Sequence, residues 1–299
     1  MSKVKIITDS CSDMGKDLRE KYDVDYARMT VTWSGVEKYA STDWEEFSAK
    51  ELYGAMRAGV RITTNQVSVA EFERVFGKYA EEGYDIVYVA CSSALSGSYN
   101  VGQVVAKNMM EKYPNCKIFC VDPKNSCAGE ALVAIEAAKL AAQGLEAEEI
   151  ARKATELSVK ALQFVTTDTL TYLKRAGRVK AAAAFFGNLF GIKPIIISNE
   201  KGENEAIKKI KGRKNAMNAC VDMLKASIDA GDVPASEQTV YVVNADCVED
   251  SDYLVSKVKE VINPKDIYVN TIGPIIGASV GPGAVAVYAF GNPKTALGE

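Results

Sequence analysis

The stretch that indicates the fold most directly is IVYVACSSALSGS, residues 86–98. Its first five residues, Ile86–Ala90, are apolar and rich in β-branched and aromatic types, which is typical of a buried strand. A serine-rich loop follows, and a helix is expected over about Tyr99–Lys112. A strand, a polar loop and a helix in this order form the repeating unit of a parallel α/β sheet.

The same order occurs on both sides of this stretch. Val4–Thr8 leads through a polar loop to a helix that runs towards Tyr22, and Lys117–Val121 leads to a long alanine-rich helix that ends near Gly144. The pattern predicts an N-terminal α/β domain, residues 1–160, that has a parallel sheet with helices on both faces.

Two serine or threonine motifs predict helix starts between these units. Thr42-Asp43-Trp44-Glu45 and Ser68-Val69-Ala70-Glu71 both match a capping box, in which a hydroxyl and a carboxylate satisfy free backbone amides. The second motif begins a helix expected over Val69–Glu82. The polar segment before it, Ile62–Gln66, is expected at the edge of the parallel sheet.

The second half of the chain changes its pattern. After a helix over Glu146–Lys160, the sequence predicts a mixture of hairpin and βαβ elements, and therefore a C-terminal α+β domain over residues 161–299. Asn199-Glu200-Lys201-Gly202 is a favourable hairpin turn. The predicted elements are strands Gln163–Thr167, Ile192–Ser198, Glu203–Ile210, Thr239–Asn244, Ile267–Thr271 and Ala284–Ala289, with helices Lys214–Ala230 and Ser251–Ile262.

Composition excludes several classes of protein. The 299 residues contain 36 Lys and Arg against 39 Asp and Glu, and this net charge of −3 disfavours nucleic acid as a partner. The chain has no histidine, so Ser–His–Asp, Cys–His and histidine-based zinc chemistry are excluded. No cofactor motif is present, because neither Gly-x-Gly-x-x-Gly nor a P-loop occurs.

The start of the chain and its long uncharged stretches bear on location. The apolar run at the N-terminus ends at Asp9 and is too short for a signal peptide. The seven scattered cysteines are typical of free thiols in a reducing cytosol. The uncharged stretch 267–293 is interrupted by Gly-Pro pairs, which predicts two buried strands joined by a glycine-rich loop rather than a transmembrane segment. We therefore expect a cytoplasmic protein.

Hydroxyl-rich loops are the leading candidates for binding. In an open α/β sheet, ligands bind beyond the carboxyl ends of the strands, where loops enter helices. Ser96-Gly97-Ser98 opens a helix, whose free amides and dipole favour a carboxylate or phosphate, and Gly97 allows close approach. The alternative is that Ser96 or Ser98 is only the N-cap. A magnesium site at Asp9 and Asp122 is disfavoured because no third carboxylate lies nearby in the sequence.

The second domain contributes a cation and an apolar stretch. Arg178 follows a helix break at Gly177 and could bind an acidic ligand bidentately, whereas Lys174 and Arg175 are better explained as surface charges. A small-residue helix is expected over Ala181–Phe190. Its phenylalanines could line a tunnel for an acyl chain, although such a stripe is more often ordinary core.

Set in order, six short motifs resemble those of the DegV family of bacterial fatty-acid-binding proteins, which includes the acyl-binding subunits of fatty acid kinase. For example, Ser92–Tyr99 is similar to the family's Ser-Ser-x-Leu-Ser-Gly-Thr-Tyr. Thr64–Ser68 stands where the family has Thr-Ser-Gln-Pro-Ser. The six segments are Thr8–Ser10, Thr64–Ser68, Ser92–Tyr99, Leu173–Arg178, Ile192–Pro194 and Gly277–Gly283.

The resemblance implies a long-chain fatty acid bound between the two domains. Its carboxylate would be held by Thr64 and Ser96, with Arg178 nearby, and Ser93, Gly97 and Ser279 belong to the same ligand-binding set. Ser279 stands where the family often has histidine, so it can donate a neutral hydrogen bond but has no titrating imidazole.

The family resemblance also implies a function without catalysis. The protein would carry no cofactor and would present the acyl carboxylate to an ATP-dependent fatty acid kinase, with at most transient contact with a membrane surface. Two alternatives stay open. One is a small-molecule enzyme that uses Asp9, Ser96 and Arg178 on a carboxylated or phosphorylated metabolite. The other is a regulatory partner protein whose lipid is only structural.

Overall fold

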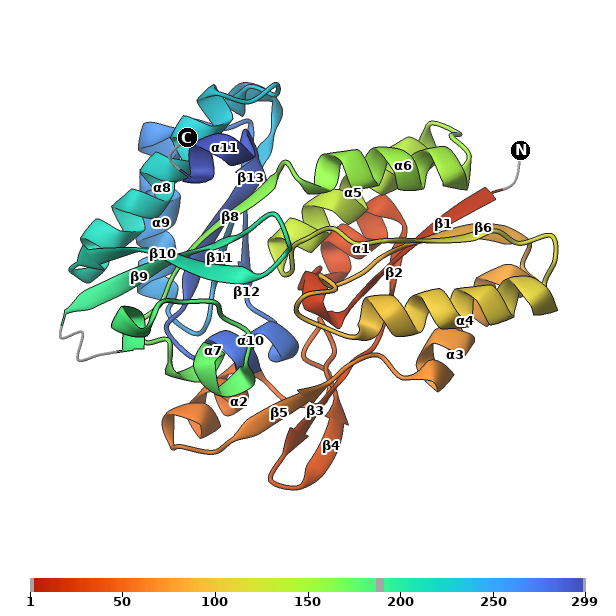
Figure 1. The fold of residues 1–299 in the computed structure, drawn as a ribbon, viewed down its shortest axis with the longest axis horizontal. Helices are drawn as coiled ribbons and strands as arrows, with labels where there is room; N and C mark the ends of the chain where they lie inside the picture. Colours follow the sequence, from red (N-terminus) through yellow and green to blue (C-terminus); the bar gives the residue numbers. More distant parts are fainter. Residues whose placement is uncertain (1–2, 187–190, 298–299) are drawn as a thin grey trace. The chain divides into compact units, whose positions relative to one another are not determined.

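The computed structural model describes residues 3–186 and 191–297, and its chain folds into two compact units (Figure 1). The first unit contains Met1–Glu46, Ile62–Val159 and Gly273–Ile275. The second contains Phe47–Arg61, Lys160–Ile272 and Ile276–Glu299. Each unit therefore takes in a segment that the sequence patterns assign to the other half of the chain. The contiguous domains 1–160 and 161–299 stay a prediction.

The first unit is built on a four-stranded parallel sheet with the order β2-β1-β6-β7. Helices α5 and α6 lie on one side of it and α3 and α4 on the other, and α1 packs beside α5 (Figure 1). The prediction of a parallel sheet covered on both faces is confirmed. The strands are β1 Lys3–Asp9, β2 Val24–Ala27, β6 Tyr84–Val89 and β7 Ile118–Val121, and the helices are α1 Lys16–Tyr22, α3 Val69–Glu81, α4 Ser98–Lys112, α5 Ala128–Ala142 and α6 Ala147–Ser158.

A small antiparallel sheet with the order β4-β3-β5 completes the first unit. Its strands are β3 Thr30–Trp33, β4 Val36–Tyr39 and β5 Ile62–Asn65. The segment Ile62–Gln66 was expected at the edge of the parallel sheet, but β5 instead lies at the edge of this separate antiparallel sheet. Strands β2, β3 and β4 were not predicted, because four-residue strands that include charged and hydroxyl side chains show little alternation.

The two predicted capping boxes fare differently. Ser68 does cap α3, and its hydroxyl accepts a hydrogen bond from the Glu71 backbone amide, but the Glu71 carboxylate binds Arg28 and Arg74 instead of the N-cap. The box at Thr42–Glu45 was wrong, since no helix begins there. The helix begins after Ser48, which forms a complete capping box with Glu51.

The second unit is built on a six-stranded mixed sheet with the order β10-β9-β8-β13-β11-β12. All neighbouring pairs are antiparallel except β11 and β12, so the predicted α+β character is confirmed. Strands β9 and β10 form the predicted hairpin. The strands are β8 Ala161–Thr166, β9 Ile192–Ser198, β10 Asn204–Lys211, β11 Thr239–Asn244, β12 Asp266–Thr271 and β13 Val285–Phe290.

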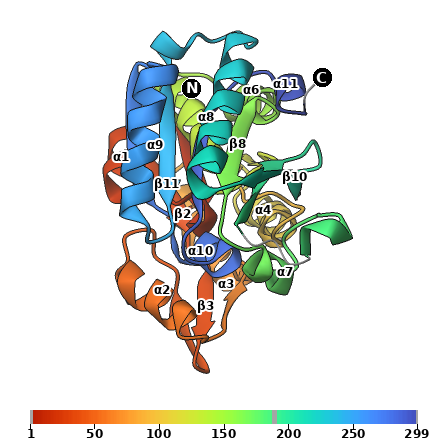
Figure 2. The same ribbon diagram turned by 90° about the vertical axis from the view of Figure 1, so that its left-hand side faces the viewer.

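Helices α8 and α9 lie side by side against this sheet (Figure 2). They bury a core that includes Phe164 and Leu224, both fully enclosed. None of the helices within the described ranges has the length and apolar character that crossing a bilayer requires. The helices of this unit are α2 Ala49–Arg57, α7 Thr171–Ala176, α8 Arg213–Asp229, α9 Val248–Val261 and α11 Pro293–Leu297, and α10 Pro274–Val280 is divided between the two units.

Two predictions for the second half were wrong in part. The loop expected between the last two strands contains helix α10, and β12 is a partly exposed edge strand rather than a buried one. A proline at the first position of α10 explains the helix, because proline is favoured there. The helix expected over Ala181–Phe190 is only a 3₁₀ turn at Ala183–Phe186, and residues 187–190 lie outside the described ranges.

Candidate functional site

The parallel sheet has its topological switch point between β1 and β6. The strand order 2-1-6-7 means that the chain leaves β1 and β6 towards helices on opposite faces of the sheet. A crevice beyond the carboxyl ends of two such strands is where ligands bind in open α/β sheets. The loops that begin at Asp9 and at Ala90 border this position.

Asp9 holds the two loops together at the switch point. One carboxylate oxygen accepts a hydrogen bond from the Cys11 amide at 2.8 Å. The other accepts from the Tyr88 hydroxyl at 2.7 Å and from the Cys91 amide at 2.9 Å. Burial raises the pKa of Asp9, and these hydrogen bonds lower it only in part. Both oxygens are therefore committed to the fold, which leaves this carboxylate poorly placed to act on a substrate.

Two further buried carboxyl groups lie near Asp9, and no sequence pattern indicated either of them. The Thr8 hydroxyl donates to Glu130 at 2.6 Å, and burial together with the charge of Asp9 raises the pKa of Glu130 well above its ordinary value. Burial also raises the pKa of Asp13 to about 7. Glu130 stands in an alanine-rich helix and Asp13 in a short loop, so neither is part of a recognisable motif.

The loop that follows β6 forms a tight turn that enters α4. The amides of Leu95 and Ser96 both donate to the Ser92 carbonyl, at 2.9 and 3.0 Å. The Ser96 hydroxyl accepts from the Ser98 amide at 3.2 Å and lies 3.0 Å from the Ser98 hydroxyl. Ser96 thus stands at the free amide end of a 15-residue helix, where the helix dipole favours an anion.

The segment that carries Thr64 is attached to this turn. The Val67 amide donates to the Ser98 hydroxyl at 3.1 Å. The side chain of Gln66 lies over Gly97, since a Cβ atom at residue 97 would stand 2.0 Å from the Gln66 Oε1 atom. The structure therefore brings the segment after β5 against the start of α4, so that Thr64, Ser96 and Gly97 belong to neighbouring segments.

The Ser93 hydroxyl has a hydrogen-bond partner directly after β7, the strand next to β6. Its hydroxyl donates to the Asp122 carboxylate, which also accepts from the Lys124 ammonium at 2.7 Å. Burial raises the pKa of Asp122, but these two hydrogen bonds, a third from the Lys124 amide and the charge of Lys124 together lower it below its ordinary value. The Ser93 hydroxyl thus links the turn to the residue that follows β7.

Arg178 and Ser279 belong to the second unit. Gly177 ends α7 in the left-handed conformation with φ of 68°, and the exposed Arg178 guanidinium donates to the Ala176 carbonyl at 3.1 Å. Ser279 is half-buried on α10, between Gly277 and Gly281. The predicted residues thus fall into two sets. Arg178 and Ser279 belong to the second unit, and the first unit contains Thr64, Ser93, Ser96 and Gly97.

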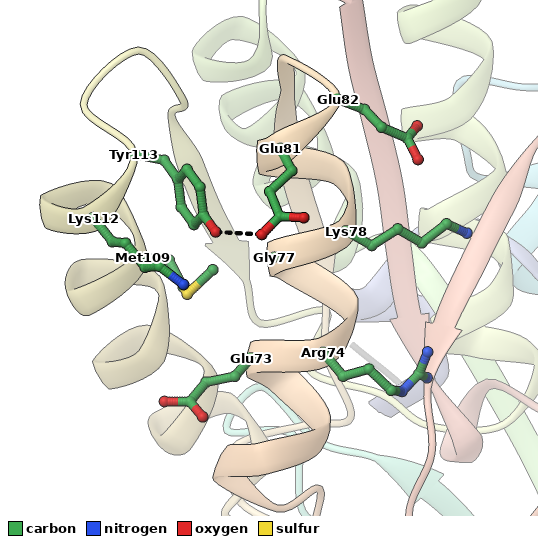
Figure 3. A pocket seen from close by; sticks show the side chains of 9 residues that line it. All are labelled: Glu73, Arg74, Gly77, Lys78, Glu81, Glu82, Met109, Lys112 and Tyr113. Carbon is green, nitrogen blue, oxygen red and sulfur yellow. Dashed lines mark hydrogen bonds between the residues drawn. The ribbon is translucent and has the colours of Figure 1, made fainter.

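A surface groove between α3 and α4 contains none of the predicted residues (Figure 3). Its volume is about 620 Å³, and the Tyr113 hydroxyl donates to Glu81 across it at 2.6 Å. Its acidic and basic side chains are equal in number, so the groove shows no preference for an acidic ligand. The lining residues are Glu73, Arg74, Gly77, Lys78, Glu81, Glu82, Met109, Lys112 and Tyr113. In the described part of the chain, no group of His, Cys, Asp and Glu is arranged to hold a metal ion.

Comparison with known proteins identifies the family. The family model described as "Uncharacterised protein, DegV family" matches residues 3–292. A DegV domain-containing protein of Clostridium perfringens is 34% identical over 294 residues, which cover 98% of this chain and 99% of the relative.

Solved structures agree with the sequence match. A DegV family protein from Thermus thermophilus, described for fatty acid binding, has a TM-score of 0.86 at 25% identity and covers 97% of this chain and 99% of its own. A Thermotoga maritima protein described as revealing fatty acid binding function has a TM-score of 0.83 at 27% identity, with 97% and 100% covered. The chain described here therefore belongs to the DegV family.

Proposed function

We propose that this protein binds a long-chain fatty acid and does not itself catalyse a reaction. The observation that carries the proposal is the Ser96 hydroxyl at the amide end of α4, beside the segment of Thr64. Hydroxyl and amide donors at a helix N-terminus suit a carboxylate. The fatty acid binding described for the Thermus and Thermotoga relatives supports the same ligand.

In this proposal each unit supplies part of the recognition. Thr64 and Ser96 donate hydrogen bonds to the carboxylate, and Arg178 and Ser279 contribute from the second unit. Apolar side chains cover the acyl chain, each methylene of which adds about 0.8 kcal/mol when it is buried. No cofactor takes part, and any contact with a membrane surface is transient.

The first test is mass spectrometry of the purified protein, native and then after organic extraction. We expect one fatty acid per chain, and its mass gives the acyl length and unsaturation. If the native protein carries no lipid and binds none of a series of added C14 to C18 acids, the proposal is wrong.

Matched variants then test the residues. Thr64→Val is compared with Thr63→Val, because the two threonines stand on opposite faces of β5. Arg178→Ala is compared with Lys174→Ala, which removes a neighbouring surface charge. A hydrogen bond to a charged group is worth about 1.5–3 kcal/mol, so we expect a loss of roughly tenfold or more for Arg178→Ala. Equal affinities within each pair would refute the assignment.

We also propose that the bound fatty acid is presented to a separate ATP-dependent fatty acid kinase. The test incubates the loaded protein with kinase and ATP and traps acyl phosphate with hydroxylamine as the hydroxamate. Hydroxamate is expected only when this protein, the kinase and ATP are all present. Formation without the kinase would instead favour the alternative of an enzyme. The geometry disfavours that alternative, because both carboxylate oxygens of Asp9 are buried and hydrogen-bonded.

A further inference from the structure

Helix α2 is the part of the second unit that comes from the first half of the chain. It belongs to the segment Phe47–Arg61, and the chain on both sides of this segment belongs to the first unit. Its capping box at Ser48 and Glu51 gives it a defined start, and it buries Leu52, Tyr53 and Met56. Figures 1 and 2 both show α2 near α10, the helix that carries Ser279.

Tyr53 connects α2 to the segment of Ser279. Its ring is fully buried, and its hydroxyl donates to the Ile272 carbonyl at 2.6 Å, just before α10. A Cβ atom at Gly277 would stand 2.4 Å from the same hydroxyl oxygen, so the backbone of α10 lies directly on the phenol. Tyr53 therefore contacts two points of this segment: Ile272, just before α10, and Gly277, two residues before Ser279.

Tyr172 makes a second connection. Its hydroxyl donates to the Met56 carbonyl of α2 at 3.3 Å. A Cβ atom at Gly281 would stand 2.1 Å from its ring, so this tyrosine also lies on the backbone two residues after Ser279. Tyr172 stands on α7, whose last turn leads to Arg178. Tyr172, on the helix that precedes Arg178, thus contacts both α2 and the segment that carries Ser279.

We propose that Tyr53 and Tyr172 are positioning residues, which hold Ser279 and Arg178 in the geometry that binds the acyl carboxylate. This inference rests on the proposed function. Hydrogen bonds weaken steeply outside a narrow range of distance and angle, so donors on a short helix and after a helix end need rigid support. The two tyrosine hydroxyls provide that support, since one binds the carbonyl before α10 and the other binds α2, and they hold the aromatic side chains against the glycine backbone.

The experiment compares Tyr53→Phe and Tyr172→Phe with Tyr253→Phe. Tyr253 is in the same unit and donates its hydroxyl to Asn218 at 2.8 Å, away from both segments, so it is a matched loss of one hydrogen bond. Each variant is titrated with a long-chain fatty acid and with its methyl ester, which has the same acyl chain but no carboxylate. Thermal unfolding checks that each variant is folded.

We expect Tyr53→Phe and Tyr172→Phe to weaken binding of the acid about tenfold and binding of the ester less than about twofold, a loss of the size that one hydrogen bond contributes. Tyr253→Phe should change neither. A double variant Tyr53→Phe/Ser279→Ala should bind the acid no more weakly than Ser279→Ala alone, because Tyr53 acts through Ser279.

The possible failures are distinguishable. If the unaltered protein binds neither acid nor ester, the proposed function fails and this inference falls with it. If the unaltered protein binds the acid but both tyrosine variants lose acid and ester equally, the tyrosines only stabilise the fold and the positioning role is wrong. Unchanged acid binding in both variants overturns it as well. If Tyr53→Phe does not fold, Tyr172→Phe decides.

Discussion

The buried carboxyl group of Asp13 makes the stability of the first unit depend on pH, and Asp13→Asn should remove that dependence. Asp13 is 5% exposed and stands in the left-handed conformation with φ of 50°, which asparagine also tolerates. Burial raises its pKa from 3.8 to about 7, although hydrogen bonding from Cys127 and Gly273 acts in the opposite direction.

The magnitude follows from linkage between proton binding and folding. Because the folded-state pKa exceeds the unfolded value, the folded chain holds this proton more tightly, and the free energy of unfolding falls as pH rises from 3.8 to about 7. The difference between the two pKa values corresponds to about 4 kcal/mol at 1.36 kcal/mol per pKa unit. Asp13→Asn should therefore match the parent near pH 4 and exceed its stability by up to about 4 kcal/mol at pH 8.

Urea unfolding between pH 4 and pH 8, followed by tryptophan fluorescence, measures this difference. Both tryptophans, Trp33 and Trp44, are in the same unit as Asp13, so the signal reports the relevant part of the chain. Asp122→Asn is a control of opposite sign, because the pKa of Asp122 is lowered and its ionised form stabilises the fold above the ordinary pKa. A difference between Asp13→Asn and the parent that does not vary with pH would refute the reasoning.

Three further perturbations test the packing. Gly97→Ala forces the Gln66 side chain aside, so we expect thermal unfolding to show a loss of about 1 kcal/mol in the free energy of unfolding. The double variant Gly97→Ala/Gln66→Ala should recover this loss, and a double variant that stays equally destabilised would contradict the contact. Tyr88→Phe removes a buried donor from Asp9 and should destabilise by about 1–3 kcal/mol in urea, whereas a neutral result would mean that Asp9 does not need this bond. Phe164→Ala leaves a cavity in the core of the second unit and should lower the free energy of unfolding by about 3–5 kcal/mol in urea. A decrease below about 1 kcal/mol would show that the core collapses into the cavity.

The elements that could be predicted are those with strong local patterns. The strand, loop and helix over 86–112 and the β9–β10 hairpin agree with the sequence within a residue or two, since apolar runs, hydroxyl-rich loops and turn residues act over short distances. The missed strands β2–β4 are four residues long and carry too little alternation. The box at Thr42 competed with a complete one at Ser48, and the reciprocal bonds of Ser48 and Glu51 decided the helix start.

The position of the Ser96 hydroxyl could be predicted from the sequence, whereas the hydrogen-bond partner of Ser93 could not. Ser96 was identified because a serine and a glycine before a helix favour an anion, and the structure does place its hydroxyl at the start of α4. Ser93 belongs to the same motif, yet its hydroxyl donates to Asp122 from the next strand. No local pattern distinguishes two serines three positions apart when their partners come from elsewhere in the chain.

Periodicity and motifs read in order were enough to predict the class of both halves, the order of most helices and strands, and the family. Three features could be seen only in the folded chain: α2 belongs to the second unit, Asp13 and Glu130 are buried near Asp9, and Tyr53 lies against α10. The hydrogen bond from Tyr53 to Ile272 joins residues 219 positions apart. Such a contact exists only once the whole chain has packed, and no periodicity along the sequence encodes it.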